Sequence, residues 1–279
     1  MSTNPSSAVR DPWDIVQIAR NPQRPYTLDY VNRIFERFVE LHGDRRCADD
    51  GAMVAGIGFV EDQAVAVIGQ QKGRTGPERR ARNFGMARPE GYRKARRVME
   101  LAARFGHPVV TFLDTPGADC LEESEGRGIS EAIASNQRAM FALPVPVVSV
   151  VVGEGGSGGA IGIGVGDRVY MQENTYYSVI MPEACAAILW HDPTQNQRAA
   201  EALKLTPADA LRLGLIDGII PEPEGGAHLD RDAAAVLVRE QLVRALRELV
   251  KIKPDKLRAA RYDKFRRMGA PEGYEVGQL

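Results

Sequence analysis

A dense run of glycines at residues 152–160 is the segment of the sequence best suited to chemistry. Its glycines are Gly153, Gly155, Gly156, Gly158 and Gly159. Glycine leaves peptide N–H groups uncovered by a side chain and tolerates the sharp backbone turns that expose them. When such N–H groups begin a helix, the helix dipole places partial positive charge behind them. The run therefore indicates an oxyanion hole, a site that stabilises negative charge developing on a carbonyl oxygen.

Three other interpretations of the same glycine run can be weighed against the oxyanion hole: a dinucleotide-binding loop, a P-loop and a tight turn. Gly153, Gly155 and Gly158 match the G-x-G-x-x-G dinucleotide fingerprint, but the apolar stretch that follows ends at Asp167. That stretch is too short for a crossover helix, so this interpretation is less favoured. A P-loop requires Lys and then Ser or Thr after the last glycine, and Ala160 stands there instead, which excludes it. A tight turn whose glycines only allow close packing stays open.

Positive charge concentrates in residues 71–104, which carry 11 Lys and Arg against three Glu. A solvated helix face with ion-paired neighbours is the ordinary explanation of such a cluster. The functional explanation is a site for the phosphate groups of a ligand. Lys72, Gly73 and Arg74 are the first candidates for these contacts, followed by residues 79–82. Nucleic acid is not favoured as a ligand, because few aromatic residues that could stack on bases are interleaved.

The loop DTPGA at 114–118 follows a continuous apolar run. Ligands of α/β proteins bind near the carboxyl ends of buried strands, which makes this loop a candidate part of a binding site. The candidate substrate contacts are Thr115, Pro116, Gly117 and Ala118. A turn started by Pro116 explains the same residues without a ligand, and this alternative also stays open.

Strands and helices that alternate along the chain must position these groups. The apolar runs at 108–114 and 145–152 predict strands buried on both faces. Helices are expected at 89–106 and 129–143, so the pattern indicates an α/β protein with right-handed crossovers. Further elements are expected at 52–60 and 63–71, which form a hairpin, and at 230–251, a long helix near the carboxyl terminus.

Residues 27–42 are expected to form an amphipathic helix. Leu28, Val31, Phe35 and Phe38 recur there at helical spacing behind a threonine cap. No Pro/Gly/Ser-rich linker interrupts the chain between residues 27 and 252. The prediction is one domain over 27–252, with an amino-terminal arm at 1–26 and a carboxyl-terminal tail at 253–279.

The composition of the 279-residue chain is that of an ordinary globular protein. It is 44% hydrophobic and 26% charged, and its net charge of -1 provides no general attraction to nucleic acid or anionic membranes. No apolar run approaches the ~18 residues of a membrane-spanning helix, and the first residues lack the apolar core of a signal peptide. Three distant cysteines and four unpaired histidines predict neither a disulfide framework nor a metal site. We therefore expect a cytoplasmic protein.

Several long strings of the sequence resemble the alpha subunit of the bacterial acetyl-CoA carboxylase carboxyltransferase. They include RNPQRPYTLDYV (20–31), QQKGR (70–74), RNFGMARPEGYRKA (82–95), TFLDTPGA (111–118), GEGGSGGAIGIGVGDRVYM (153–171) and YYSVIMPEACAAILW (176–190). The resemblance implies an α/β, crotonase-like fold of repeated ββα units with a long C-terminal helix. It also implies transfer of a carboxyl group from carboxybiotin, delivered by a biotin carboxyl carrier protein, to acetyl-CoA, which gives malonyl-CoA. No covalently bound cofactor is expected in this chain.

The resemblance further implies a partner and a set of site residues. The partner is a beta subunit that carries a zinc ribbon, and the expected assembly is an alpha2-beta2 heterotetramer. The residues carried over by the resemblance are Gly158 and Gly159 as hydrogen-bond donors, Gly155, Gly156 and Ala160 as their neighbours in register, and Tyr177 and Pro182 near biotin. A bulky residue at Gly159 is expected to abolish transfer while folding remains largely intact.

The stretch at 119–128, DCLEESEGRG, departs from the family pattern, in which Tyr, Pro and Gly follow the TPGA string. Two alternatives to acetyl-CoA carboxylation therefore stay open. One is a carboxyltransferase subunit for another acyl-CoA. The other is a noncatalytic partner of the same fold.

Overall fold

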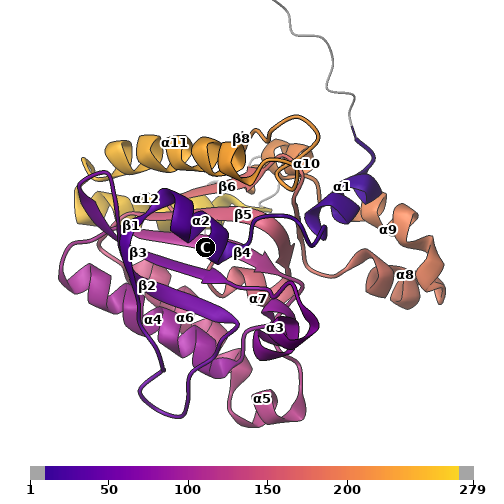
Figure 1. Ribbon diagram of the computed structural model, residues 1–279, viewed down its shortest axis with the longest axis horizontal. Helices are drawn as coiled ribbons and strands as arrows, with labels where there is room; N and C mark the ends of the chain where they lie inside the picture. The colour runs from indigo at the N-terminus through magenta and orange to yellow at the C-terminus, as the bar shows by residue number, and fades with distance from the viewer. Residues whose placement is uncertain (1–9, 270–279) are drawn as a thin grey trace, which may run out of the picture.

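One mixed sheet of eight strands runs through the computed structural model, which describes residues 10–269 (Figure 1). The strands are β1 (Glu36–Glu40), β2 (Met53–Val60), β3 (Gln63–Gln70), β4 (Val109–Thr115), β5 (Val147–Gly156), β6 (Arg168–Gln172), β7 (Tyr176–Ser178) and β8 (Gly218–Ile220). Their order is β1-β2-β3-β4-β5-β6-β8, and β7 pairs with the end of β5. β1, β2 and β3 are antiparallel, whereas β3, β4, β5, β6 and β8 are parallel.

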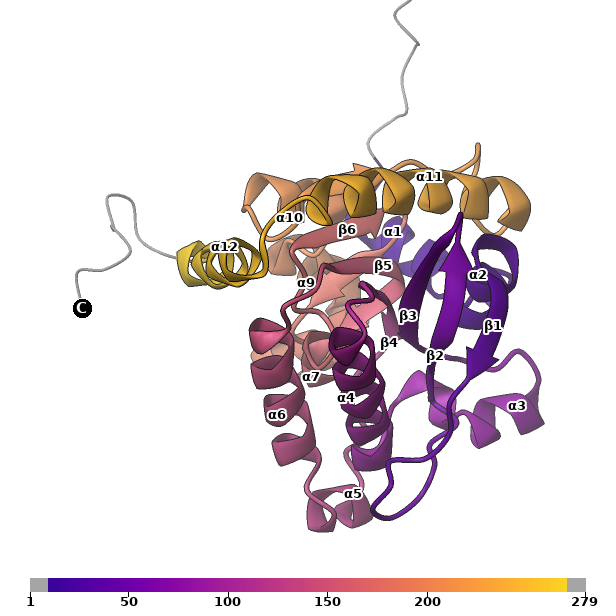
Figure 2. The ribbon, with the colours of Figure 1, turned by 90° about the vertical axis from the view of Figure 1, so that its left-hand side faces the viewer.

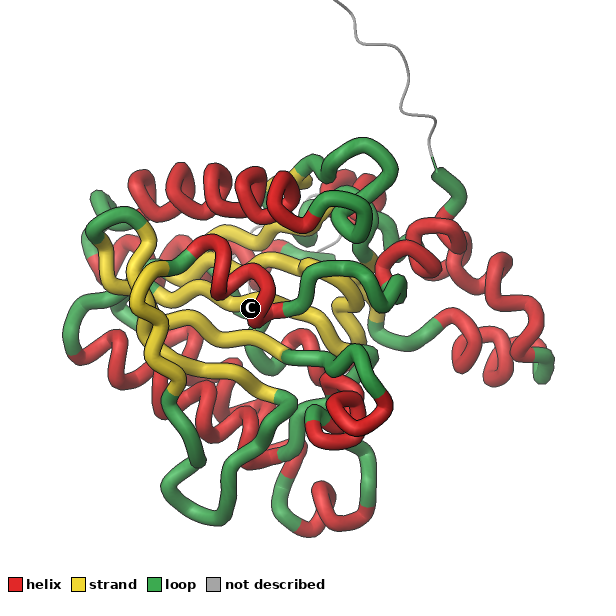
Figure 3. Tube along the Cα trace, in the orientation of Figure 1, coloured by secondary structure: helices red, strands yellow, loops and turns green. Residues whose placement is uncertain are grey.

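Helices cover both faces of this sheet (Figures 2 and 3). They are α1 (Pro12–Ala19), α2 (Thr27–Ile34), α3 (Gly76–Ala81), η1 (Asn83–Gly85), α4 (Pro89–Arg104), α5 (Glu122–Gly126), α6 (Ile129–Ala142), α7 (Ser157–Ile161), α8 (Pro182–Trp190), η2 (Pro193–Gln195), α9 (Asn196–Leu203), α10 (Pro207–Arg212), α11 (Arg231–Leu249) and α12 (Pro254–Arg267). α4 and α6 lie on one face, α2 and α11 on the other, and α8 and α9 project to one side as a separate lobe. The predicted α/β class and crotonase-like architecture are confirmed.

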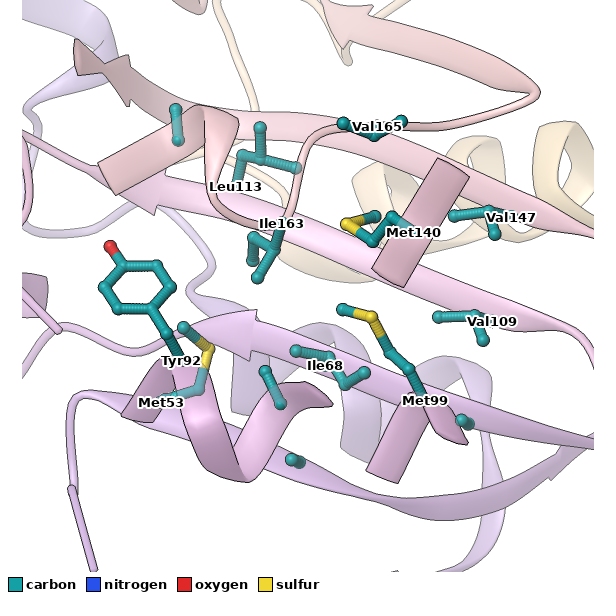
Figure 4. Close-up of a cluster of buried hydrophobic side chains, with 14 of the residues drawn as sticks. Met53, Ile68, Tyr92, Met99, Val109, Leu113, Met140, Val147, Ile163 and Val165 are labelled. Atoms are coloured by element: carbon teal, nitrogen blue, oxygen red, sulfur yellow. The ribbon is translucent and has the colours of Figure 1, made fainter. Parts of the chain in front are cut away.

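Two apolar cores result, one on each face of the sheet. Figure 4 shows the first, in which Met99 and Met140 from α4 and α6 pack against Val109 and Val147 from the sheet. On the opposite face Phe112 packs with side chains from α2 and α11. Every residue of β4 and β5 is buried, which explains why their sequences are continuous apolar runs and not alternating ones.

The prediction of a helix at 27–42 is right for its first half and wrong for its second half. α2 ends at Ile34, and residues 36–40 form the edge strand β1, paired with β2. Two glycines of β2, Gly56 and Gly58, leave open the space that the ring of Phe38 occupies. Tertiary pairing along the sheet edge thus outweighs the helical spacing of the apolar residues. The predicted hairpin and the helices expected at 89–106, 129–143 and 230–251 are confirmed.

Both terminal segments pack against the sheet domain over the residues that the structure describes. In the arm, the buried guanidinium of Arg24 pairs with Glu222 at 2.6 Å. In the tail, buried Arg261 of α12 binds both carboxylate oxygens of Asp167 at 2.9 and 2.7 Å. The other N–H groups of the Arg261 guanidinium donate to the backbone carbonyls of Met140, in the last turn of α6, and of Leu143 and Val145, which follow α6. The predicted boundaries at 26/27 and 252/253 stay a prediction, and residues 1–9 and 270–279 lie outside the described range.

Replacing Arg261 with methionine is expected to lower the free energy of unfolding by about 3–5 kcal/mol, because Asp167 would remain buried without its cation. Urea unfolding followed by circular dichroism measures this loss. The matched control on the same helix is Arg258→Met, whose exposed pair with Asp255 should contribute less than about 1 kcal/mol. Equal losses in the two variants would contradict a structural role for α12.

Candidate functional site

The glycine run lies where β5 ends and the short helix α7 begins. β5 continues through Gly156, and α7 starts at Ser157, which has a left-handed φ of 50°. The first N–H groups of a helix have no partner within it. Among the residues that the structure describes, no acceptor is found for the N–H groups of Gly158 and Gly159. The two N–H groups predicted as donors are therefore unpaired within the described residues, and their role as donors to a ligand stays a prediction.

The loop after β4 packs directly against α7. A Cβ atom at Gly156 would collide with the carbonyl group of Pro116, and one at Gly159 would lie 2.7 Å from the backbone nitrogen of Ala118. The glycines at these two positions therefore allow close packing of the backbone, as the tight-turn interpretation of the run expects. By contrast, a Cβ atom at Gly158 would meet only Ile133, at 3.6 Å. The segments predicted separately as donors and as substrate contacts therefore lie directly against each other, and their use as one site stays a prediction.

This packing corrects one expectation. A bulky residue at Gly159 would displace the backbone of the 115–118 loop, so folding near the site would not remain intact. Gly158 is the position where a side chain can be added without moving the backbone. It is therefore the better position for testing the N–H groups of α7.

A buried network of charges lies beneath the glycine run. Lys72 Nζ is 2.7 Å from Asp114 Oδ1 and 2.6 Å from Glu154 Oε1. Glu154 also accepts hydrogen bonds from the hydroxyl of Tyr176, at 2.5 Å, and from Arg20 Nε, at 2.9 Å. These bonds connect the ends of β4, β5 and β7 with the amino-terminal arm. The network fixes the strand ends from which the candidate site extends.

The pKa values of these groups follow from burial and pairing. Burial alone would raise the pKa of Glu154, but the ammonium of Lys72 and hydrogen bonds from Lys72 and Tyr176 lower it to about 2. Burial likewise opposes the charged form of Lys72, yet Asp114 and Glu154 outweigh this and raise its pKa. Burial raises the pKa of Asp114. Lys72 therefore stays charged and Glu154 ionised at neutral pH.

The residues predicted to bind phosphate have other partners. Lys72 is neutralised by the two carboxylates. Arg74 pairs with Asp29 at 2.7 Å and lies over the ring of Tyr26. Gly73 is tightly packed beneath α3. These contacts give the three residues a structural function, and their proposed contact with phosphate stays a prediction.

Of the two residues predicted near biotin, the structure places Tyr177 at a cavity beside α7 and Pro182 elsewhere. Tyr177 packs against Gly155 and lines a cavity of about 480 Å³ together with Ser157 and Gly158. Pro182 instead is buried in the first turn of α8 and is not among the residues that line this cavity.

Sequence reasoning missed Arg20 and Asp114 as partners of Glu154, and it assigned no function to Phe265 and Met268, which line the cavity. These residues lie far apart in the chain and match no local motif.

Within residues 10–269, no three His, Cys, Asp or Glu side chains are grouped as metal ligands. No helix in that range is long and apolar enough to cross a membrane.

Residues 7–269 match the family model described as acetyl co-enzyme A carboxylase carboxyltransferase-like. The chain belongs to this family. A relative from Thermus thermophilus is 53% identical over 259 residues, which cover 93% of this chain and 83% of the relative. Another, from Geobacter sulfurreducens, is 56% identical over 256 residues, with coverages of 92% and 80%. Both relatives are named acetyl-coenzyme A carboxylase carboxyl transferase subunit alpha.

Solved structures of a transcarboxylase and of a malonate decarboxylase share the fold of this chain. A transcarboxylase 12S chain with methylmalonyl-coenzyme A bound superposes with a TM-score of 0.68 at 18% identity, over 90% of this chain and 47% of that one. The chain thus spans about half the length of the transcarboxylase chain. A Pseudomonas malonate decarboxylase in complex with coenzyme A gives a TM-score of 0.63 at 18% identity, with coverages of 79% and 90%. At these identities the likeness concerns the fold alone.

Proposed function

We propose that this chain is the alpha subunit of a carboxyltransferase that moves the carboxyl group of carboxybiotin to acetyl-CoA. The observation that carries the proposal is the pair of unpartnered N–H groups of Gly158 and Gly159, beside a loop packed against them, in a member of this family. Carboxybiotin releases its carboxyl group as CO2, which leaves negative charge on its ureido oxygen. The biotin anion then takes the alpha proton of acetyl-CoA, and the resulting enolate carbon bonds to CO2 to give malonyl-CoA. The N–H groups of α7 donate to that oxygen.

The chain's own residues do little covalent chemistry in this mechanism. Each N–H donor aimed at the developing charge contributes about 3–4 kcal/mol to transition-state stabilisation. Ser157 makes no hydrogen bond to a base among the described residues, so it is not an activated nucleophile. The Lys72–Asp114–Glu154 network holds the strand ends and so fixes the position of α7 relative to the loop.

A second subunit is part of the proposal. The thioester of acetyl-CoA also develops negative charge, and a beta subunit with a zinc ribbon would provide that second anion site. Exposed apolar side chains around α8, including Val179 (76% exposed) and Ile188 (66%), offer a surface for protein contact. An alpha2-beta2 assembly, a biotin carboxyl carrier protein and a cytoplasmic location complete the proposal.

Malonyl-CoA formation tests it directly. The chain is mixed with the candidate beta subunit, carboxylated carrier protein and acetyl-CoA, and the product is followed by mass spectrometry. We expect product only when both subunits are present. A parallel mixture contains propionyl-CoA in place of acetyl-CoA. A carboxylated product from propionyl-CoA and not from acetyl-CoA would favour a carboxyltransferase subunit for another acyl-CoA. The absence of product from either substrate would favour a noncatalytic partner.

A further inference from the structure

Arg20, which caps the carboxyl end of α1, joins three segments of the chain. Its Nε donates a hydrogen bond to Glu154 Oε2 at 2.9 Å, and its two terminal nitrogens donate to the two carboxylate oxygens of Glu183 at 2.5 and 3.2 Å. Glu154 lies near the end of β5, and Glu183 lies in the first turn of α8. The planar guanidinium thus holds one carboxylate with a fork of two hydrogen bonds and a second one with Nε. A lysine ammonium is a single point charge and cannot reproduce this geometry.

The Glu154 end of this link is held by three side chains. Its Oε1 accepts a hydrogen bond from Lys72, and its Oε2 accepts hydrogen bonds from Arg20 and from the hydroxyl of Tyr176. The guanidinium carbon of Arg20 also lies 5.8 Å from the centre of the Tyr176 ring and 6.0 Å from that of Trp13 in α1. Glu154 stands three residues before the start of α7. Its carboxylate therefore ties Arg20 to the β5–α7 junction.

The Glu183 end of the link belongs to the lobe formed by α8 and α9. The lobe has a small apolar cluster of its own, apart from the two sheet cores, formed by Cys185, Ala186 and Ala199. Figure 1 shows α1 beside α9, on the side of the sheet where the lobe projects. Val16 of α1 belongs to one apolar cluster with Ala200 of α9 and Tyr176 of β7. The lobe therefore contacts the sheet through the same short helix that ends at Arg20.

Charge and exposure distinguish the two halves of the link. Burial opposes ionisation of Glu183, but hydrogen bonding to Arg20 and its positive charge outweigh this effect and lower the pKa of Glu183. The side chain of Glu183 is 36% exposed, whereas that of Glu154 is 9% exposed. Ion pairs as exposed as the one with Glu183 contribute little to the stability of a fold. A requirement for a fixed position of α8 therefore explains this pair better than a requirement for stability.

We propose that Arg20 is a positioning residue for carboxyl transfer, which fixes the first turn of α8 relative to the β5–α7 junction. β7 runs between the two, because Tyr176 and Ser178 pair with Glu154 and Gly156 of β5 and the chain then enters α8. A movement of the lobe on contact with a protein partner would pass along β7 to the glycine run if Arg20 did not hold both ends. The inference rests on the proposed function, because this junction carries the N–H groups assigned there as donors.

Hydrogen–deuterium exchange of the full chain tests the coupling without relying on activity. Glu183→Ala cuts the link at the lobe, and we expect the amides of residues 153–163 to exchange at least about threefold faster than in the wild type. The matched control is Glu201→Ala, which removes an exposed glutamate of α9 and should leave exchange in 153–163 unchanged. Faster exchange confined to α8 and α9 in Glu183→Ala would overturn the proposal, since the link would then stabilise the lobe alone.

The kinetics of malonyl-CoA formation with the beta subunit are the second measurement. Arg20→Lys keeps the positive charge and loses the fork, so we expect kcat to fall about tenfold while KM for acetyl-CoA changes less than about twofold. The matched control is Arg198→Lys, at an exposed arginine of α9, which should leave kcat and KM unchanged. The double variant of Arg20→Lys with Glu183→Ala should be about as slow as Arg20→Lys alone, because both changes interrupt one link.

The two measurements separate this proposal from the proposed function. An unchanged kcat in Arg20→Lys, or losses that multiply in the double variant, would overturn the positioning role. If the wild type formed no malonyl-CoA with its beta subunit, the proposed function would fail, and the exchange of residues 153–163 in Glu183→Ala would still decide whether Arg20 couples the lobe to the junction.

Discussion

Replacing Lys72 with methionine is expected to lower the free energy of unfolding by about 3–5 kcal/mol. The ammonium group is shared by Asp114 and Glu154, and both carboxylates are buried. Without it, two buried carboxylates would lie close together with only Arg20 and Tyr176 to compensate Glu154. Urea unfolding monitored by far-UV circular dichroism measures the effect.

Two variants show whether buried charge is the cause. Arg247 forms an exposed pair with Glu61, so Arg247→Met should cost less than about 1 kcal/mol. The double variant Lys72→Met with Glu154→Gln should recover part of the stability, because one of the uncompensated carboxylates is removed. If Lys72→Met unfolded at the wild-type urea concentration, the network would not hold the strand ends.

Placing a valine at Gly158 is expected to reduce carboxyl transfer at least about a hundredfold while stability stays within about 1 kcal/mol of the wild type. A Cβ atom there meets only Ile133, at 3.6 Å, so valine fits without moving the backbone, and Gly158 itself lines the cavity beside α7, where added bulk would crowd a ligand oxygen. Valine keeps the N–H group, but crowding that keeps the oxyanion out of reach of one donor has the effect of losing that donor, about 10²–10³ in rate. Malonyl-CoA formation by the reconstituted complex gives the activity, and thermal unfolding gives the stability.

Gly159→Val is the instructive comparison. Its side chain would collide with the backbone of the loop that contains Gly117 and Ala118, so we expect both stability and activity to fall. The Gly158 variant should lose activity alone. Near-normal transfer by Gly158→Val would mean that the N–H groups of α7 do not face the reacting oxygen.

The sequence predicts the fold best where a segment is dominated by one physical requirement. β4 and β5 are buried on both faces, and a continuous apolar run is the direct result. The glycine run likewise identifies the β5–α7 junction, because close backbone contact permits no larger residue at Gly156 or Gly159. The segment at 27–42 fails as a helix because its second half is decided by edge pairing with β2, which no local spacing reveals.

Long-range partners explain the parts of the candidate site that the sequence does not predict. A lysine in a basic segment suggests a contact with phosphate, yet the fold brings Lys72 to carboxylates at 114 and 154. Phe265 and Met268 stand in a segment rich in charge and separated by about a hundred residues from Ser157. Only tertiary structure places them around one cavity.

Infrared difference spectroscopy of bound biotin tests most directly whether the N–H groups of α7 polarise the ureido carbonyl. Biotin labelled with ¹³C at that carbon is added to the complex of this chain with its beta subunit, and the isotope-sensitive carbonyl band is compared with the band in water. We expect the band to move to lower frequency in the wild type and to return toward its position in water in Gly158→Val. A band at the same frequency in water and in the wild-type complex would contradict the assignment of an oxyanion hole to this segment.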